Sequence, residues 1–435
     1  MNEATTFEAL QLAAPLQRAL RERNYTAPTP IQAQAIPPQL ERRDLMGCAR
    51  TGTGKTAAFA LPILHHLANS KGKPRSGQTR TLVLTPTREL AVQVGESFSE
   101  YGKYLKLRHA LVYGGVSQVP QVRALRKGLD ILVATPGRLI DLLDQGRLDL
   151  SGVEFLVLDE VDRMLDMGFI HDVRRIAEEL PKKRQTSLYS ATITREVEKV
   201  AQQFVNDPVR IEISPDAPVT DKIHQQVCHV RSTNKLPLLE HLLGGGETDN
   251  IPKKTLVFSR TKFGADKLAR KLDKLGYRSE AIHGNKSQAA RQRALNHFRD
   301  GRVPVLVATD VAARGIDVKD IHLVVNYDLP DGADTYVHRI GRTARAESRG
   351  RAVSFCESRE IREFRGIERT LKMTVEMDGT HPYHQEPPAA KAGGGKGNQG
   401  AGKGKRPYRF DKNRGNNKGK NFSGRKSRPA SRAAR

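Results

Sequence analysis

Short apolar runs that each end in a polar motif constrain the fold of this chain most. In the first half they are TLVLTP (81–86), ILVATP (131–136), FLVLDE (155–160) and TSLYSAT (186–192). In the second half they are TLVFSR (255–260), VLVATD (305–310) and HLVVNYD (322–328). The runs are short and rich in β-branched residues, and they do not alternate with polar residues, a pattern typical of parallel strands buried on both faces. The amphipathic stretches 87–101 and 261–275 lie between runs and predict crossover helices. Both halves are therefore predicted to be α/β layers, and the near-identity of ILVATP and VLVATD indicates two related domains.

The length and the proline distribution predict two folded domains. A chain of 435 residues exceeds one ordinary domain of about 100–200 residues. The stretch NDPVRIEISPDAPV (206–219) holds three prolines and no clear helical pattern, which is typical of a linker. We therefore predict an N-terminal domain over 1–207, a linker over 208–219, a second domain over 220–380 and a tail over 381–435.

The positive charge is concentrated at the C-terminal end. The net charge of +25 predicts a polyanionic partner, either nucleic acid or an acidic membrane surface. Residues 391–435 contain 15 Lys and Arg against the single acid Asp411, and they also contain ten glycines and only three aromatic residues. So little apolar surface predicts disorder. Both a solubilising tail and a sequence-independent RNA or DNA anchor fit this composition, and Tyr408, Phe410 and Phe422 would add base stacking to the anchor.

Several classes of protein are disfavoured by composition. The three cysteines are scattered, which excludes a disulfide framework and a CxxC-type zinc site. The first ten residues are acidic and lack an apolar core, so no signal peptide is predicted. No apolar stretch approaches the ~20 residues that span a bilayer. The tail shows no amphipathic helix or lipidation motif, which disfavours a membrane-surface ATPase. We expect a soluble, cytoplasmic protein.

Residues 49–56, ARTGTGKT, predict a phosphate site. Glycines allow backbone N–H groups to approach a polyphosphate, Lys55 supplies positive charge, and Thr56 offers a hydroxyl to Mg²⁺. Ala49 stands where the strict P-loop pattern has glycine, so a Gly-rich turn without a ligand is the alternative reading. FLVLDEVD adds the second half of an NTPase: Asp159 would hold Mg²⁺, directly or through water, and Glu160 would orient and deprotonate the attacking water. Asp-Glu after a strand can simply begin a loop, but its combination with GTGKT favours the catalytic interpretation.

The segment HRIGRTAR (338–345) supplies positive charge. Arg339, Arg342 and Arg345 are three residues apart and would share one face of a helix. Arg342 and Arg345 would then be arginine fingers across an interdomain cleft. A solvated basic face is the alternative.

Ten motifs occur together in a characteristic order. They are TPIQ (29–32), ARTGTGKT (49–56), PTREL (86–90), GG (114–115), TPGR (135–138), DEVD (159–162), SAT (190–192), VFSRT (257–261), ARGID (313–317) and HRIGRTAR (338–345). With these motifs the chain resembles the DEAD-box ATP-dependent RNA helicases across about residues 5–375. The stretches 163–175 and 281–288 look most like the bacterial RhlE-like branch. The resemblance implies two tandem RecA-like domains, each a mostly parallel sheet flanked by helices, with ATP and Mg²⁺ as cofactors.

The resemblance also implies roles in nucleotide binding. Tyr25 would stack on adenine, Gln32 would read its edges, and Phe7 would support that pocket. The other nucleotide-binding residues implied are Thr51, Gly52, Thr53, Gly54, Lys55, Thr56, Asp159, Gly315 and Asp317. Glu160 would be the catalytic base, assisted by Lys55, Arg342 and Arg345. Ser190 and Thr192 would bond with Asp162 and His338, which would couple hydrolysis to duplex opening.

The partner implied is RNA, single-stranded or a short duplex, bound mainly through phosphates and 2′-hydroxyls and therefore largely independent of sequence. In the first domain the implied contacts are Thr87, Arg88, Gly115, Thr135, Gly137 and Arg138. In the second they are Arg260, Thr261, Gly284, Gln288, Arg291, Thr309, Asp310 and Arg314. Ribosomal precursors and RNA-decay proteins are candidate partners, and no membrane is expected.

Two positions depart from the family pattern. Val161 stands where the family has alanine, which puts in question the packing against Ser190–Thr192. Ala344 stands where the family usually has glycine, and we expect a helical backbone there that tolerates the change. A DNA translocase with the same ATP site and an ATP-dependent RNA clamp with weak turnover are the alternative functions.

Overall fold

The computed structural model describes residues 6–49, 52–213, 223–244, 254–313, 318, 320–344 and 350–386. Some of the predictions above fall outside the described residues. They are those for Thr51, Arg314, Gly315, Asp317 and Arg345, for linker residues 214–219, and for the tail from residue 387 onward.

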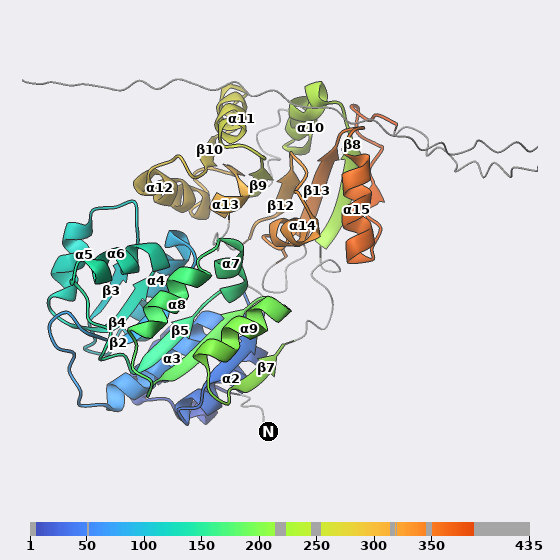
Figure 1. Ribbon diagram of the computed structural model, residues 1–435. Coiled ribbons are helices and arrows are strands. Elements are labelled where there is room, and N and C mark those ends of the chain that lie inside the picture. Colours follow the sequence, from blue (N-terminus) through green and yellow to red (C-terminus); the bar gives the residue numbers. More distant parts are fainter. Residues whose placement is uncertain are drawn as a thin grey trace, which may run out of the picture. The chain divides into compact units, whose positions relative to one another are not determined.

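The first domain is built on a sheet of seven parallel strands. The strands are β1 (Leu45–Cys48), β2 (Thr79–Leu84), β3 (His109–Val112), β4 (Leu129–Ala134), β5 (Phe155–Leu158), β6 (Gln185–Ser190) and β7 (Val209–Glu212). Their order across the sheet is β3-β4-β2-β5-β6-β1-β7 (Figure 1). Each pairing is parallel and in register, for example Leu84 with both Ala134 and Leu158.

The second domain repeats this order. Its strands are β8 (Ile223–His229), β9 (Thr255–Phe258), β10 (Ser279–Ile282), β11 (Val305–Ala308), β12 (Leu323–Asn326), β13 (Gly350–Cys356) and β14 (Glu376–Met377). The order is β10-β11-β9-β12-β13-β8-β14, so that each strand takes the place of the strand seven earlier in the chain. The two halves are therefore related domains, as the paired apolar runs predicted.

Helices bury both faces of the first sheet. On one face pack α1 (Ala14–Glu22), α2 (Pro30–Leu40), α3 (Lys55–Asn69) and α4 (Arg88–Tyr101). On the other pack α5 (Gln118–Leu125), α6 (Pro136–Asp144), α7 (Val161–Asp166), α8 (Ile170–Glu178) and α9 (Arg195–Phe204). Successive strand residues alternate between these two cores, since Val83 belongs to the first and Leu82 and Leu84 to the second. Burial on both faces explains why the runs were uniformly apolar.

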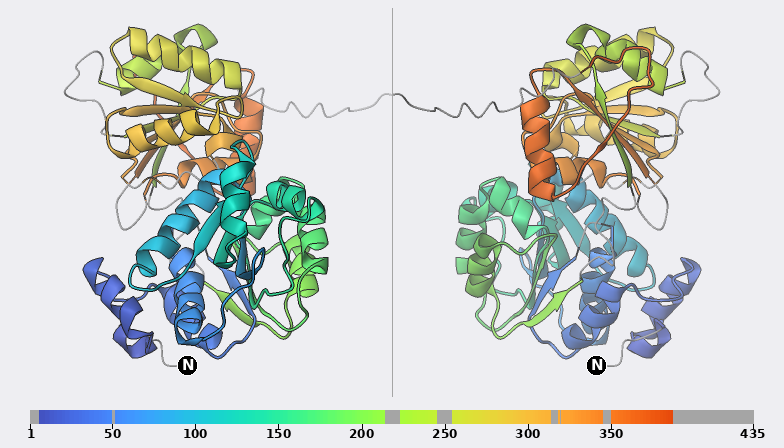
Figure 2. Two further views of the ribbon diagram at one scale, coloured as in Figure 1. Left: turned by 90° about the vertical axis from the view of Figure 1, so that its left-hand side faces the viewer. Right: turned by 90° about the vertical axis from the view of Figure 1, so that its right-hand side faces the viewer.

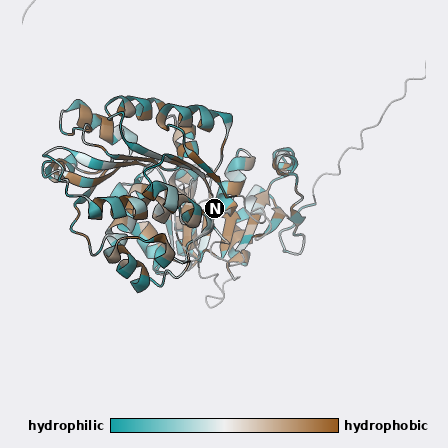
Figure 3. Cartoon of the chain, turned by 90° about the horizontal axis from the view of Figure 1, so that it is seen from below, coloured by the Kyte–Doolittle hydropathy of each residue, from teal (hydrophilic) through white to brown (hydrophobic). Residues whose placement is uncertain are grey.

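The second sheet is covered in the same way. Helices α10 (Lys235–Leu242) and α11 (Lys262–Lys274) pack on one face. On the other pack α12 (Gln288–Arg299), α13 (Asp310–Ala313), α14 (Ala333–Ile340) and α15 (Ile361–Leu371). Figure 2 shows helices on both faces of each sheet, and Figure 3 shows hydrophobic residues concentrated on the strands.

The seven predicted strands and both predicted helices are confirmed, each within a few residues of its run. The predicted linker is wrong at its start, because Val209–Glu212 form β7 and pair with β1. Residues 381–386, assigned to the tail, contact the second domain: Gln385 N–H donates to the His229 carbonyl at 3.0 Å, and His381 is buried. In the described part of the chain, no helix combines the length and the apolar character needed to cross a membrane.

A buried glutamine joins α2 to the sheet that it covers. Gln39 is 1% exposed, and its Nε2 donates to the Ala35 and Ala58 carbonyls and contacts the Tyr189 hydroxyl. Its Oε1 accepts from the Ser187 hydroxyl at 2.8 Å. The Gln39 side chain therefore links α2 to α3 and β6. It holds in place the helix that also carries Gln32.

We expect Gln39→Leu to destabilise the first domain by about 1–3 kcal/mol, because it leaves buried polar groups without partners. Gln34→Leu is the matched control, since Gln34 is exposed on the same helix. Urea denaturation of both variants checks this. Equal midpoints for the two variants would remove the structural role assigned to Gln39.

Candidate nucleotide and RNA site

In the first domain, the predicted site residues lie at the carboxyl ends of the strands. Phe7, Tyr25 and Gln32, which precede β1, are the exceptions among the described residues. Because every strand is parallel, these ends meet along one edge of the sheet. Nucleotide residues follow β1 and β5, and the SAT motif follows β6. The predicted RNA residues follow β2, β3 and β4, which are neighbours on the other side of β5. The strand order therefore sorts two groups of residues onto adjacent parts of one edge.

The loop between β1 and α3 has the geometry of a phosphate cradle. Gly52 and Gly54 have φ values of 84° and 93°, a region that favours glycine. Lys55 is buried at the first position of α3, and its Nζ donates to the Ala49 carbonyl at 2.6 Å. The backbone of this loop thus keeps the ammonium group at the helix N-terminus, where the helix dipole also favours an anion.

Gln32 ties α2 to this loop. Its Nε2 donates to the Gly54 carbonyl at 3.1 Å, and its Oε1 accepts from the Thr29 N–H at 3.0 Å. A Cβ at Gly54 would collide with the Gln32 amide. The orientation of the amide is therefore fixed by both bonds, and Thr29 is a contributor that the sequence reasoning missed. The signal was present, because Thr-x-x-Gln is a capping-box pattern.

An aromatic wall lies beside the loop. Phe7 and Tyr25 are stacked with ring centroids 6.0 Å apart, and Tyr101 lies 6.2 Å from Tyr25. Phe7 is buried, and Gln17 donates to its carbonyl at 2.7 Å. These rings, Gln32 and the phosphate loop line a cavity of about 650 Å³ that also reaches Asp159 and Glu160. A flat heterocycle joined to phosphates fits such a lining.

The two acids after β5 are both buried. Burial raises the pKa of Asp159, while the nearby Lys55 opposes that rise. Asp159 Oδ1 is buried and has no hydrogen-bond partner. Glu160 has a left-handed φ of 55° and forms a buried ion pair with Arg163, three residues later on α7. A carboxylate oxygen lacking a partner suits a Mg²⁺ ion, which binds through few protein oxygens together with phosphates and water. The Thr56 hydroxyl, in the first turn of α3, is the second protein group that could bind this ion.

Asp162 connects the DEVD segment to the end of β6. Its Oδ2 accepts from the Ala191 N–H at 3.0 Å, from the Thr192 N–H at 3.1 Å and from the Thr192 hydroxyl at 3.2 Å. The Ser190 hydroxyl accepts from the Asp162 N–H and donates to the Thr192 carbonyl. Val161 is buried in the core on the α7 face, and these contacts are formed with valine in place.

The helical prediction for 338–345 is wrong for residues 341–344. Helix α14 ends at Ile340, with Gly341 as its C-cap, so Arg339 is helical and Arg342 is not. Arg339 is 2% exposed and bonds to both carboxylate oxygens of Asp310, with Nη2 to Oδ2 at 2.7 Å. Asp310, predicted to contact RNA, is thus engaged within the domain.

The expectation at Ala344 is also wrong. Its φ is 53°, in the left-handed region that a Cβ disfavours, because the chain turns after α14 instead of continuing as a helix. The nearby Arg342 is buried, and its Nε donates to the His338 carbonyl at 3.1 Å. His338 itself lies in the last turn of α14.

In the first domain the predicted RNA residues form the starts of helices and turns. Thr87 caps α4 through a bond from the Leu90 N–H, and Arg88 is the first residue of that helix. The Arg88 guanidinium lies against Gly115, where a Cβ would collide with it. Thr135 is the N-cap of α6, followed by Gly137, and Arg138 donates to the Val116 carbonyl at 3.3 Å.

The second domain places its predicted RNA residues after the corresponding strands. Arg260 and Thr261 follow β9, Gly284 follows β10, and Thr309 follows β11. Thr261 caps α11, as Thr87 caps α4. The Arg260 N–H donates to Asp328 Oδ2 at 2.9 Å. Gln288 and Arg291 lie in the first turn of α12. The two sheets therefore present their predicted RNA residues from equivalent edges.

Arg163 is a second residue that the sequence reasoning missed. It is 3% exposed. Its Nη1 pairs with Glu160, and its Nη2 is buried without a hydrogen-bond partner. The spacing of three from Glu160 on a helix was the available signal.

Comparisons with known proteins identify the family of this chain. Residues 29–200 match the family model described as DEAD/DEAH box helicase, and residues 234–347 match the one described as helicase conserved C-terminal domain. The RNA helicase CrhR of Synechocystis is 42% identical over 374 residues, which cover 86% of this chain and 74% of that protein. ATP-dependent RNA helicase DeaD of Escherichia coli K12 is 45% identical over 85% of this chain and 58% of its own length.

A solved structure is similar over most of the chain. Dbp5 of Saccharomyces cerevisiae bound to RNA and ADP BeF3 matches with a TM-score of 0.75 at 31% identity, covering 86% of this chain and 96% of that one. The chain spans about half the length of several of the curated relatives that it matches, 44% in one and 56% in another.

We expect Arg163→Met to destabilise the first domain by about 3 kcal/mol, because it leaves the Glu160 carboxylate buried without its partner. Adding Glu160→Gln in the same chain should recover part of the loss, since no unpaired charge remains. Urea unfolding of the two single variants and the double variant gives the coupling. Strictly additive losses would show that the ion pair is not what holds the two side chains.

Proposed function

Because the chain belongs to the DEAD-box ATP-dependent RNA helicases, we propose that it couples ATP hydrolysis to the local opening of short RNA duplexes. The observation that carries this proposal is the convergence of Lys55, Asp159 and Glu160 beside the Gln32–Tyr25 pocket. One cavity thus contains a phosphate site at Lys55, the two acids Asp159 and Glu160, and the Gln32 amide that would recognise the adenine.

The proposed ATP site divides the nucleotide among these parts. Tyr25 stacks on adenine with support from Phe7, and Gln32 reads the adenine edge, which selects ATP over GTP. The loop residues Thr51, Gly52, Thr53, Gly54 and Lys55 surround the phosphates with N–H groups and one ammonium. The unpartnered Asp159 Oδ1 and the Thr56 hydroxyl hold Mg²⁺, which neutralises phosphate charge when bound. Gly315 and Asp317 would complete the site at phosphate and ribose.

Glu160 is the proposed base. It accepts a proton from the attacking water as the oxygen adds to the γ-phosphorus and ADP leaves. In the structure its carboxylate pairs with Arg163, so Arg163 holds the base at the start of α7. Arg342 and Arg345 are the proposed arginine fingers, which stabilise charge on the transferred phosphoryl group only when both domains close around ATP and RNA.

Asp162 supports the coupling proposal. Its carboxylate binds the backbone of Ala191 and Thr192, so a shift of the DEVD segment moves the end of β6 with it. Together with Ser190, Thr192 and His338, this link would couple the presence of ATP or ADP to the conformation of the RNA-binding residues.

RNA is the proposed partner, held through its backbone by helix starts after β2–β4 and β9–β11. Support comes from the relatives named RNA helicases and from the RNA in the Dbp5 structure. Ribosome assembly and RNA decay are the proposed settings, and the cytoplasm is the proposed location.

A second candidate, an ATP-dependent RNA clamp with slow turnover, is favoured by Ala344. Its left-handed backbone lies between Arg342 and Arg345, so the methyl group adds strain where the fingers must move. The clamp would bind the same ligands as the helicase, ATP and RNA, but it would hydrolyse ATP more slowly.

The deciding experiment measures ATP hydrolysis without nucleic acid, with single-stranded RNA, and with DNA of the same sequence. We expect a large stimulation by RNA alone, because the proposed contacts include 2′-hydroxyls. Equal stimulation by DNA would indicate a general nucleic-acid translocase. ATP-dependent retention of RNA with no hydrolysis would indicate the clamp.

We expect Glu160→Gln to retain ATP binding and to lose hydrolysis by at least about a hundredfold, since a neutral amide cannot accept the proton. Binding of a fluorescent ATP analogue and single-turnover hydrolysis check this. Glu178→Gln is the matched control, because Glu178 is exposed at the end of α8, the helix that leads to the amino end of β6. Normal turnover in Glu160→Gln would assign the base elsewhere.

A further inference from the structure

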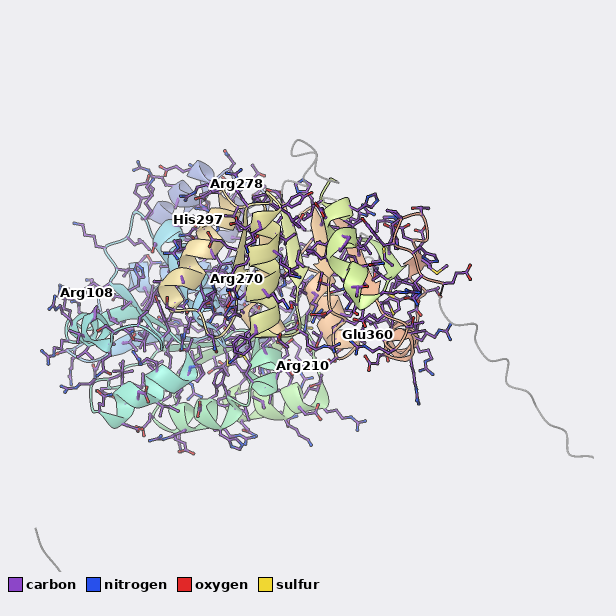
Figure 4. All side chains as sticks on the ribbon, turned by 90° about the horizontal axis from the view of Figure 1, so that it is seen from above. Arg108, Arg210, Arg270, Arg278, His297 and Glu360 are labelled. Carbon is purple, nitrogen blue, oxygen red and sulfur yellow. The ribbon has the colours of Figure 1, made fainter. Side chains whose placement is uncertain are left out.

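A basic groove lies along α15, the last long helix of the second domain. It has a volume of about 890 Å³, and its lining includes Arg362, Arg365, Arg369 and Lys372. All four side chains are exposed. Figure 4 labels Glu360, the N-cap residue from which this helix starts. The groove holds no residue of the predicted nucleotide or RNA sites.

The four cations form one stripe along the helix. Arg362, Arg365 and Arg369 are three and four residues apart in α15, which places them on the same face, and Lys372 is the C-cap residue directly after this helix. From Arg362 to Lys372 the stripe is about 15 Å long, which corresponds to about four or five phosphates at about 3.4 Å per nucleotide of one strand. The opposite face of the helix is apolar, and Phe364 and Ile367 anchor it in the core. The stripe is therefore held by a fixed element and not by a loop.

Three of the acids near the stripe are engaged by other groups, whereas Glu363 of α15 is exposed and lies outside the groove lining. Glu357 pairs with Lys235 at 3.0 Å and with Arg359 at 3.1 Å. Glu360 pairs with Arg260 at 3.3 Å. Glu368, the only acid in the groove lining, accepts from the Val375 N–H at 2.9 Å. No ion pair to the four cations occurs among the described residues. Their positive charge is thus left for a ligand outside this fold.

We propose that this groove is a second RNA-binding surface, which holds the phosphate backbone of RNA that extends beyond the segment gripped at the strand edges. The proposal rests on the proposed function for its choice of RNA as the polyanion. Four exposed cations without aromatic neighbours in the lining suit phosphates and not bases. Binding here is therefore independent of sequence.

The position of the groove in the fold supports an extended ligand. Helix α15 follows β13 and precedes β14, whereas the predicted RNA residues follow β9, β10 and β11 at the other side of the sheet. A short RNA that fills only those edges has no need of α15. The described chain ends close by, because Gln385 is bonded to His229 of β8, and the positive charge of Arg365 acts on His229. In the sequence, the +14 segment 391–435 comes next.

The test uses the full chain with Arg362, Arg365 and Arg369 changed together to Gln. A second triple variant changes them to Lys and keeps the charge. The matched control changes three exposed lysines of the first domain, Lys182, Lys183 and Lys199, to Gln. Lys182 and Lys183 precede β6, at the edge of the sheet opposite to the predicted site. Circular dichroism verifies that each variant is folded.

RNA affinity is measured against salt for single-stranded RNAs of about 10 and about 30 nucleotides. Each lost phosphate contact lowers the slope of log K against log salt by about 0.7, so the Gln triple should lower it by about 2 on the long RNA. The short RNA should bind all proteins equally. The Lys triple and the control should keep the full slope.

Three outcomes would overturn the proposal. One is an unchanged slope for the Gln triple on the long RNA. A second is an equal loss on the short RNA, which would place these residues in the primary site. A third is intact RNA binding with lost binding of poly-glutamate, which would make the groove a surface for an acidic protein. Since binding is measured without hydrolysis, a failure of RNA to stimulate the ATPase would count against the proposed function alone.

Discussion

The parallel arrangement of each sheet is the constraint on which the rest of the structure depends. A parallel strand must be followed by a crossover, so every strand of the sheet ends at the same edge. In the first domain, the order β3-β4-β2-β5-β6-β1-β7 then decides which loops are neighbours. The phosphate loop after β1 and the acids after β5 lie on either side of β6. The predicted RNA loops after β2, β3 and β4 begin on the other side of β5. Nucleotide and RNA residues are thus adjacent without sharing a loop.

The contact between Asp162 and the end of β6 follows from this order. Strands β5 and β6 are neighbours, so the helix after one faces the loop after the other. Asp162 accepts two backbone N–H bonds there, and this geometry is lost if either segment moves alone. Because Glu160 precedes it on the same turn, the proposed base and the β6 loop are coupled through three consecutive residues.

The sequence predicted the strands whose runs are apolar and rich in β-branched residues, whatever their length. The strands ending at 84, 134, 158 and 190 were recognisable because both of their faces are buried. Strands β7 and β8 were missed because polar residues alternate along them. Strand β1 is as short and as buried as β5, but its sequence LMGC has no β-branched residue, and the sequence of β13, GRAVSFC, is interrupted by Arg351 and Ser354. In the site, the motifs located the phosphate loop and the acids.

Side-chain pairings and turns were less accessible. The Arg163–Glu160 and Arg339–Asp310 pairs depend on distances across a turn or between elements, which spacing alone does not fix. The backbone of Ala344 was mispredicted because an alanine does not itself signal a left-handed turn. The glycine that the family usually has there was the available signal.

The two domains show how one topology gives two different sites. Lys55 begins α3 after β1, and Lys235 begins α10 after β8, the corresponding strand. Both lysines are buried, but Lys235 lies among the carboxylates of Asp328, Glu357 and Glu360, at 3.4, 3.0 and 3.7 Å. Asp328 lies two residues after β12, as Glu160 lies two residues after β5.

In the second domain, carboxylates therefore surround Lys235. In the first domain, phosphates would take the equivalent place around Lys55. A polyphosphate would meet three negative charges around Lys235 and would be repelled. The same carboxylates bind Arg260, through the Asp328 bond to its N–H and the Glu360 ion pair. The equivalent of the phosphate site has thus become the support for a residue on the predicted RNA edge. This exchange explains why one fold, used twice, gives a single predicted nucleotide site in the described chain and two predicted RNA-binding edges.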